Sequence, residues 1–214
     1  MKKMLLSYRT LIASTAVAAL LALGGCSEPA QKQAERKAEM TPDPPATGRQ
    51  AFQQMYLSAR AWSVDVQPLQ VQSYNLTQVK SEKGRAGAWQ ATFVSPSKGR
   101  QRSYSWSAVE AEGSLHKGVF AGSEDAWSGS GQQRPFLLAA LKIDSDQAYE
   151  TALKQKESME LLKKTPEMPV LFVLEQTNRF PDLTWRVVFG ESVSTSGYSV
   201  FVDATTGQFL QKAH

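Results

Sequence analysis

Two neighbouring segments near the C-terminus carry the clearest structural signal: Thr184-Trp-Arg-Val-Val-Phe189 and Tyr198-Ser-Val-Phe-Val-Asp-Ala-Thr-Thr-Gly-Gln-Phe-Leu210. Apolar and polar residues alternate in both, which is the period of a half-buried β-strand. The run from Asp203 to Gly207 predicts a turn, because an Asp side chain can bond its own downstream backbone and Gly tolerates a positive φ. A third short strand is expected from Phe209, so this region predicts a small antiparallel sheet.

A similar pattern occurs earlier in the chain. The matching segments are Trp89-Gln-Ala-Thr-Phe93 and Tyr104-Ser-Trp-Ser-Ala-Val109. The spacing from Trp to Phe, and the spacing from Tyr to the Gly that follows, are the same in both places. We interpret this similarity as an internal repeat. The alternative is one continuous antiparallel sheet with an accidental likeness between its halves.

Each copy also has a helix pattern upstream of its strands. Apolar residues within 52–59 fall on one helical face, and Asp144 or Ser145 can cap a second helix that reaches about Lys163. A further strand is expected after each helix, over 69–76 and 169–177. The predicted fold is therefore α+β, with two repeated units that each pack an N-terminal helix on a small antiparallel sheet.

The connector 121–134 is rich in Gly and Ser, which is typical of a boundary between units. We place the first unit at 51–128 and the second at 135–214. The stretch 26–50 has no large apolar residue except Met40, and its composition predicts a flexible tether.

The first 25 residues have the organisation of an export signal. A positively charged start precedes the apolar stretch 11–23, which as a helix would span roughly 20 Å and is too short to cross a bilayer. Leu23-Gly-Gly-Cys26 resembles the lipobox of bacterial lipoproteins, which implies a signal peptide over 1–25 and lipidation of Cys26. The resemblance predicts an envelope protein facing the periplasm, and Ser27 in place of Asp favours the outer membrane over the inner.

The charge balance gives no support for a nucleic-acid partner. The formal net charge of +4 comes from 24 Lys and Arg against 20 Asp and Glu. Three of the cations, Lys2, Lys3 and Arg9, leave with the signal peptide, so the mature chain carries 21 − 20 = +1. The membrane, reached through Cys26, is the first expected partner.

Three segments of the second unit together resemble a PepSY or PepSY-like module: the helix pattern Asp146–Leu153, then Thr184–Phe189, then the closing hairpin Tyr198–Leu210. The resemblance covers about 140–212. The first unit is more diverged, since Glu110-Ala-Glu-Gly113 stands where the closing turn would be. The family includes envelope and secreted modules and the propeptides of some metallopeptidases, where they are linked to peptidase inhibition. The resemblance implies a binding or regulatory module and supplies no catalytic residues.

Residues suited to catalysis or metal binding are scarce. One Cys excludes an internal disulfide, and one Cys with two His excludes a zinc site of the common structural types. No Gly-x-Ser-x-Gly sequence accompanies His116 or His214. We interpret Glu110 and Glu112 as surface carboxylates, and Asp203 lacks the ladder of oxygen ligands of a calcium loop. We expect no catalytic residue, no cofactor and no metal site.

Three residues are candidates for contact with a partner. Lys98-Gly-Arg100-Gln-Arg102 is the densest basic segment outside the signal peptide, and Arg100 and Arg102 suit an acidic partner or lipid headgroups. Trp127 lies in the connector, outside any strand pattern, and an exposed Trp there would suit an interface.

The sequence as a whole favours a lipid-anchored envelope module that binds or regulates and has no catalytic activity. An envelope protein or peptide is the expected partner, with an envelope peptidase as one candidate target. Two alternatives remain open. A structural or assembly lipoprotein would need a large apolar interface, and a carboxylate-dependent hydrolase would need a cleft where two acids converge.

Overall fold

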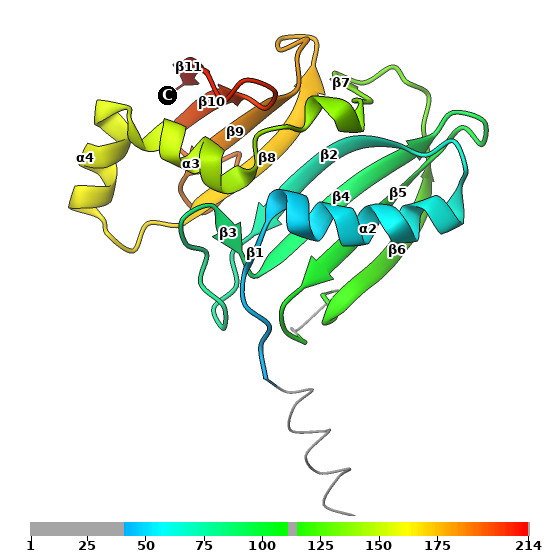
Figure 1. Ribbon diagram of the computed structural model, residues 1–214, viewed down its shortest axis with the longest axis horizontal. Coiled ribbons are helices and arrows are strands. Elements are labelled where there is room, and N and C mark those ends of the chain that lie inside the picture. The colour runs from blue at the N-terminus through cyan, green and yellow to red at the C-terminus, as the bar shows by residue number, and fades with distance from the viewer. Residues whose placement is uncertain (1–40, 111–114, 214) are drawn as a thin grey trace, which may run out of the picture.

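The computed structural model describes residues 41–110 and 115–213. The predicted signal peptide, Cys26, Glu112 and His214 lie outside the described residues, as does most of the predicted tether. The described part has an α+β fold, with three α-helices and a large antiparallel sheet (Figure 1). The predicted fold class is therefore confirmed at this level.

Within the described residues, nine strands form the large sheet. Eight of them follow the order β6-β5-β4-β2-β8-β9-β10-β11, and β7 pairs with the end of β8. Every neighbouring pair is antiparallel. The strands are β2 (Gln67–Tyr74), β4 (Ala88–Ser95), β5 (Arg100–Ser107), β6 (Gly118–Ala126), β7 (Gln133–Arg134), β8 (Val170–Thr177), β9 (Thr184–Phe189), β10 (Tyr198–Asp203) and β11 (Phe209–Ala213).

The sheet is continuous, so the small antiparallel sheets predicted for the two units are halves of one large sheet. Strands β2, β4, β5 and β6 make the first half, and β8 to β11 make the second. The halves join where β2 pairs with β8, with Gln70 opposite Glu175 and Gln72 opposite Val173. Pairing satisfies backbone groups that two separate sheets would leave at open edges. The short strands β1 (Ala46–Thr47) and β3 (Arg85–Ala86) form a separate ribbon.

The predicted closing turn is confirmed between β10 and β11. One carboxylate oxygen of Asp203 accepts hydrogen bonds from the backbone N–H groups of Thr205 and Thr206, each at 2.7 Å. Gly207 has a φ of 77°, which a side chain would disfavour. Turn chemistry thus accounts for this Asp.

The helices are α2 (Gly48–Trp62), α3 (Ser145–Leu153) and α4 (Lys156–Lys164), with a 3₁₀ turn η1 (Leu138–Ala140) before α3. Helices α2 and α3 lie in front of the sheet in Figure 1. Both begin with a capping box, formed by Thr47 and Gln50 in α2 and by Asp144 and Gln147 in α3. The predicted cap at Asp144 is confirmed.

Two helix boundaries differ from the prediction. Helix α2 begins at Gly48, inside the stretch 26–50 that we assigned to the tether, because the Thr47 hydroxyl accepts from the backbone of Gln50 and starts the helix earlier. The helix expected to reach Lys163 is interrupted after Leu153, where the chain becomes extended at Gln155 before α4 begins.

The core between helices and sheet is centred on two tryptophans. Trp89 of β4 and Trp185 of β9 are fully buried, and their rings meet edge to face with centroids 6.3 Å apart. The indole of Trp89 donates to the carbonyl of Ala46 at 3.0 Å, and that of Trp185 donates to the carbonyl of Ile143 at 2.9 Å. Each buried indole N–H therefore has a partner at the residue that precedes a helix cap.

The N-termini of α2 and α3 meet at Asp144. Its carboxylate accepts from the Thr47 hydroxyl at 2.6 Å, the Arg49 N–H at 2.9 Å and the Ser145 N–H at 2.7 Å. The Gly48 N–H donates to the Ser145 hydroxyl at 2.8 Å. One carboxylate thus serves two helix starts, where unpaired N–H groups and the positive ends of the helix dipoles favour negative charge.

Candidate partner-binding surfaces

The three predicted contact residues lie at the same end of the sheet. Arg100 begins β5 and is exposed, and in the β5–β6 register it faces Ala126, next to Trp127. The Trp127 N–H donates to the carbonyl of Gly99 at 3.0 Å, and the side chain is half-buried. The pairing of β5 with β6 therefore places Arg100, Arg102 and Trp127 at one end of the sheet.

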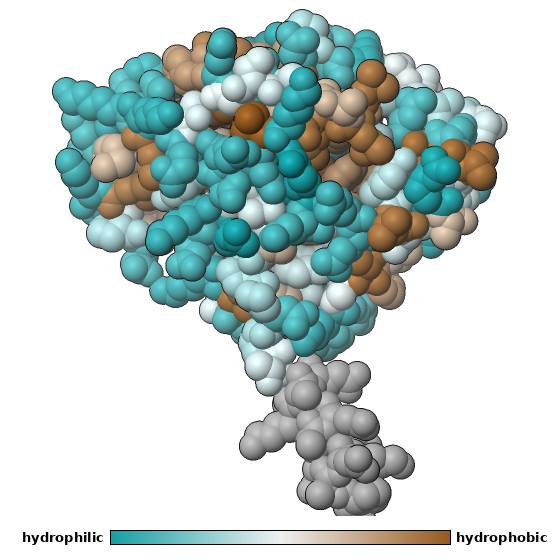
Figure 2. Space-filling model, in the orientation of Figure 1, coloured by the Kyte–Doolittle hydropathy of each residue, from teal (hydrophilic) through white to brown (hydrophobic). Residues whose placement is uncertain are grey.

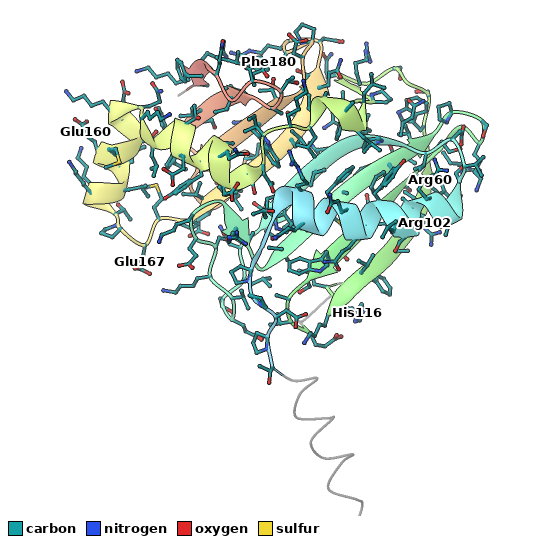
Figure 3. The ribbon with its side chains drawn as sticks, viewed as in Figure 1. Arg60, Arg102, His116, Glu160, Glu167 and Phe180 are labelled. Carbon is teal, nitrogen blue, oxygen red and sulfur yellow. The ribbon has the colours of Figure 1, made fainter. Side chains whose placement is uncertain are left out.

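Arg102 is engaged within the fold. Its Nε donates to the carbonyl of Gly122 at 2.8 Å, and its guanidinium lies 5.6 Å from the centre of the Tyr104 ring (Figure 3). The side chain is half-buried and helps to hold β6 against β5. Of the two arginines, Arg100 is the one presented to solvent.

Trp62, which the sequence did not single out, belongs to the same end of the molecule. Its indole N–H donates to Glu124 at 2.6 Å, and Lys98 donates to its carbonyl at 2.6 Å while lying 5.0 Å from the ring centre. Trp62 therefore lies between a cation of the 98–102 segment and Glu124 of β6, which faces Arg102 in the β5–β6 register.

Asp65 organises the turn beside this cluster. Its carboxylate accepts from the hydroxyls of Ser63 and Ser95, both at 2.6 Å, and from the Ser97 N–H at 2.8 Å. These hydrogen bonds, led by the one from Ser63, hold the pKa of Asp65 well below its usual range. A structural role in the turn accounts for the shift.

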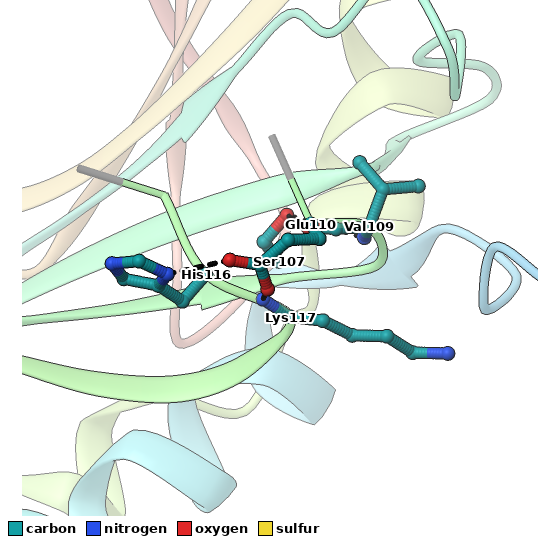
Figure 4. Close-up of polar contacts among 5 residues, drawn as sticks. All are labelled: Ser107, Val109, Glu110, His116 and Lys117. Atoms are coloured by element: carbon teal, nitrogen blue, oxygen red, sulfur yellow. Dashed lines mark hydrogen bonds and ion pairs between the residues drawn. The ribbon is translucent and has the colours of Figure 1, made fainter. Parts of the chain in front are cut away.

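His116 pairs with Glu110 on the surface (Figure 4). Their side chains are 2.6 Å apart, and Glu110 also accepts from the Lys117 N–H at 2.9 Å, which with the His116 contact lowers its pKa. The Ser107 hydroxyl drawn beside them donates to the carbonyl of Val109 and not to the histidine. Both side chains are exposed, in agreement with the surface interpretation of Glu110.

A groove between α2 and η1 has mostly apolar walls, and the sequence did not predict it. Its volume is 530 Å³, and its walls come from α2 and from the segment around η1. Leu57 is 73% exposed, Leu137 77% and Leu138 41%. Figure 2 shows hydrophobic atoms gathered over this part of the face. The lining residues are Arg49, Phe52, Gln53, Tyr56, Leu57, Leu138 and Leu141.

The groove also holds a polar donor. One guanidinium nitrogen of Arg49 donates to the carbonyl of Leu141 at 2.9 Å. The Nε atom of the same side chain is buried and has no hydrogen-bond partner in the structure. The groove therefore has mostly apolar walls with one charged side chain, Arg49, an arrangement typical of sites that bind a largely apolar segment.

Neither a metal cluster nor a membrane-spanning helix is found among residues 41–110 and 115–213. No three His, Cys, Asp or Glu side chains in these ranges lie close enough to hold a metal ion. No helix in the same ranges combines the length and the hydrophobicity needed to cross a bilayer.

Comparison with known proteins identifies a shared fold. No protein-family model matches the chain, and no curated protein matches it. A crystal structure of "a putative lipoprotein (CD1622)" from Clostridium difficile 630 is similar to it, with a TM-score of 0.50 and 12% identity over 81% of this chain and 95% of that one. At that identity the similarity establishes that the two proteins have the same overall fold.

Proposed function

We propose that this chain is a lipid-anchored cell-envelope protein whose folded domain acts by binding another envelope protein in the α2–η1 groove. The domain carries no catalytic activity in this proposal. The single observation that carries the binding role is the cluster of exposed leucines around the groove, namely Leu57, Leu137 and Leu138. Exposed apolar side chains gathered around a hollow are characteristic of interaction sites in soluble domains.

The envelope location is supported by the N-terminal sequence. Leu23-Gly-Gly-Cys26 follows an apolar stretch and resembles a lipobox, and the fold is shared with a protein described as a lipoprotein. One acyl chain holds a protein on a membrane only weakly, so the several chains of a mature lipoprotein Cys26 would give stable anchoring. Ser27 favours the outer membrane, with the domain facing the periplasm.

The tandem PepSY-like organisation is supported by the matching of the two halves. Each half has four antiparallel strands in mirrored order about the β2–β8 pair. In each half a buried Trp, Trp89 or Trp185, donates to the carbonyl one residue before the helix cap, Ala46 or Ile143. Both helices begin with a capping box whose third helical residue is Gln. On this proposal an envelope peptidase is the first target class to test, because the resemblance implies peptidase regulation.

The experiment is site-specific photocrosslinking in cells that produce the full lipidated chain. A photoreactive amino acid replaces Leu57 or Leu138, which line the groove, or Met159, which is 41% exposed on α4 and serves as a control matched to Leu138. We expect the two groove positions to capture the same envelope protein and position 159 not to capture it. Equal capture from all three positions, or capture from none, would refute the binding role of the groove.

The anchor has its own test. Cys26→Ser is expected to move the protein from the membrane fraction to the soluble periplasmic fraction and to abolish labelling by radioactive palmitate. A variant at the neighbouring position, Ser27→Ala, retains the lipobox and should remain in the membrane. Membrane association of the Cys26→Ser variant at the wild-type level would contradict lipid anchoring at this residue.

A further inference from the structure

The face of the sheet that points away from the helices carries uncharged polar side chains in its first half. Trp89 and Trp106 lie in the core on the helix side, so the residues that alternate with them point to the other face. Strands β2 and β4 contain no charged residue, and the arginines of β5 alternate with the residues of this face. The polar residues of this face are Gln70, Gln72 and Tyr74 of β2, Gln90 and Thr92 of β4, and Gln101, Ser103 and Ser105 of β5.

A groove crosses this face from β2 to the edge strand β6. Its volume is 250 Å³, which is less than the roughly 300–1,000 Å³ of sites that enclose a whole drug-sized ligand and suits one ring of a longer ligand. A Cβ at Gly122 would lie 3.1 Å from the Ser103 carbonyl oxygen, so the glycine keeps this part of the groove open. Among the described residues no charged side chain lines the groove, whose lining is Tyr74, Gln90, Ser103, Ser105, Leu115, Phe120 and Gly122.

The groove presents one unpartnered donor together with hydroxyl groups. The Gln90 amide nitrogen has no hydrogen-bond partner among the described residues and is not shielded from solvent, so a ligand can reach it. The Tyr74 hydroxyl donates to the oxygen of the same amide at 2.7 Å, which leaves the nitrogen free to donate. The Ser103 hydroxyl shares one hydrogen bond with Thr92 at 3.0 Å, and a hydroxyl can accept another. The groove therefore offers donors and acceptors without charge.

An aromatic ring forms one wall of the groove. Phe120 is 45% exposed and lies opposite Ser105 in the β5–β6 register. Its ring contacts the His116 ring, with centroids 4.6 Å apart, and His116 is held in turn by Glu110 (Figure 4). The Phe120 ring is therefore held in place before a ligand arrives, which lowers the entropy cost of binding against it.

These properties identify the class of ligand. Because no charge lines the groove, an ionic ligand would leave water without gaining a counter-charge. A purely apolar ligand would cover the amide and hydroxyl groups without pairing them. A neutral sugar avoids both costs, since its hydroxyls donate and accept and its C–H face packs against an aromatic ring.

We propose that this groove binds a neutral oligosaccharide, with one sugar ring on Phe120 and a hydroxyl of that ring bonded to the Gln90 amide. The site lies on the opposite side of the sheet from the α2–η1 groove. It does not depend on the function proposed for that groove.

The test is isothermal titration calorimetry of the full mature chain, in a detergent without a sugar headgroup, against triacetylchitotriose, cellotriose and maltotriose at millimolar concentration. We expect at least one of the three to bind at one site. Phe120→Ala should weaken that binding roughly tenfold, because it removes the ring contact. Phe209→Ala is the matched control and should bind as the wild type does, since Phe209 is 40% exposed on the opposite edge strand, β11.

Gln90→Ala gives an independent variant. It removes the free donor and should weaken binding roughly threefold to tenfold. Gln101→Ala should not weaken it, because Gln101 is half-buried on the same face but lies outside the groove. Each variant is compared only after thermal unfolding shows that it folds like the wild type. No binding of any of the three trisaccharides, equal binding of trigalacturonate or trialanine, or undiminished binding by both Phe120→Ala and Gln90→Ala would each overturn the proposal.

Discussion

Replacing Asp144 by alanine tests whether one carboxylate holds the starts of two helices. The carboxylate accepts hydrogen bonds from Thr47, Arg49 and Ser145, which belong to both helix N-termini. Asp144 is the N-cap of α3, which contributes typically about 1 kcal/mol. Its hydrogen bonds from the Thr47 hydroxyl and the Arg49 N–H at the start of α2 add about 0.5 kcal/mol each at the low end of the usual range. Negative charge beside a helix N-terminus adds about 0.3–1 kcal/mol for each helix. We therefore expect the free energy of unfolding to fall by about 2–4 kcal/mol.

The assay is urea and thermal unfolding followed by far-ultraviolet circular dichroism. In a domain of this size 1 kcal/mol lowers the Tm by about 2–4 °C, so Asp144→Ala should lower it by about 5–15 °C. Asp146→Ala is the matched control, because that carboxylate lies in the first turn of α3 but accepts only from the Gln147 backbone of its own helix. The control should lose no more than about 0.5 kcal/mol. Equal losses from the two variants would refute the reasoning.

Three further changes test other parts of the fold. Gly48→Ala would place a Cβ 2.6 Å from the ring of Trp185, so we expect a loss of about 1–3 kcal/mol in urea unfolding, and an undiminished stability would contradict the close packing. The folded-state pKa of Asp65 is lowered from 3.8, so its contribution is present above that value and is lost as the pH falls toward the lowered pKa. Asp65→Ala should therefore flatten the acid side of a stability–pH profile, and a profile parallel to the wild type would exclude this role. Arg100→Glu should weaken binding to anionic liposomes without changing the Tm, whereas Arg102→Glu should also lower the Tm because it breaks the bond to the Gly122 carbonyl. Unchanged liposome binding by both variants would show that the basic segment 98–102 does not contact anionic lipid.

Local sequence patterns predicted the parts of the fold that depend on local physics. Alternation located β9 and β10, and the turn at Asp203 follows from hydrogen bonds within a few residues. The equivalence of Trp89 and Trp185 was visible as a shared spacing, and both are core residues. These features are determined by residues close to them in the chain, so they could be predicted from a single sequence.

The junction between the halves could not be predicted in the same way. Pairing of β2 with β8 joins strands about one hundred residues apart, and nothing in the alternation of either strand specifies its neighbour. The break after Leu153 has no Gly or Pro to mark it. Helix α2 did carry a signal for its early start, the Thr47-x-x-Gln50 capping box, which the low hydrophobicity of the surrounding stretch obscured.

The candidate surfaces also differ in how far local sequence could predict them. A basic hairpin tip is visible as a run of cations, so Arg100 and Arg102 could be named from the sequence. That Arg100 is exposed and Arg102 half-buried could not be predicted, because the position of Arg102 depends on a hydrogen bond to Gly122 of another strand. The exposed leucines were missed because exposure is set by what packs nearby: Leu57 lies off the buried face of α2, and Leu138 is carried there by η1.

The contacts between the halves imply that they unfold together. A polar junction at Asp144, the edge-to-face contact of Trp89 with Trp185 and the β2–β8 pairing all cross the same boundary. Separating the halves would leave the half-buried Asp144 carboxylate without its partners, two large rings without their packing and two strands with open edges. Each of these losses is unfavourable, and they would occur at once. We therefore expect the described chain to unfold as one cooperative unit, whatever the origin of the likeness between its halves.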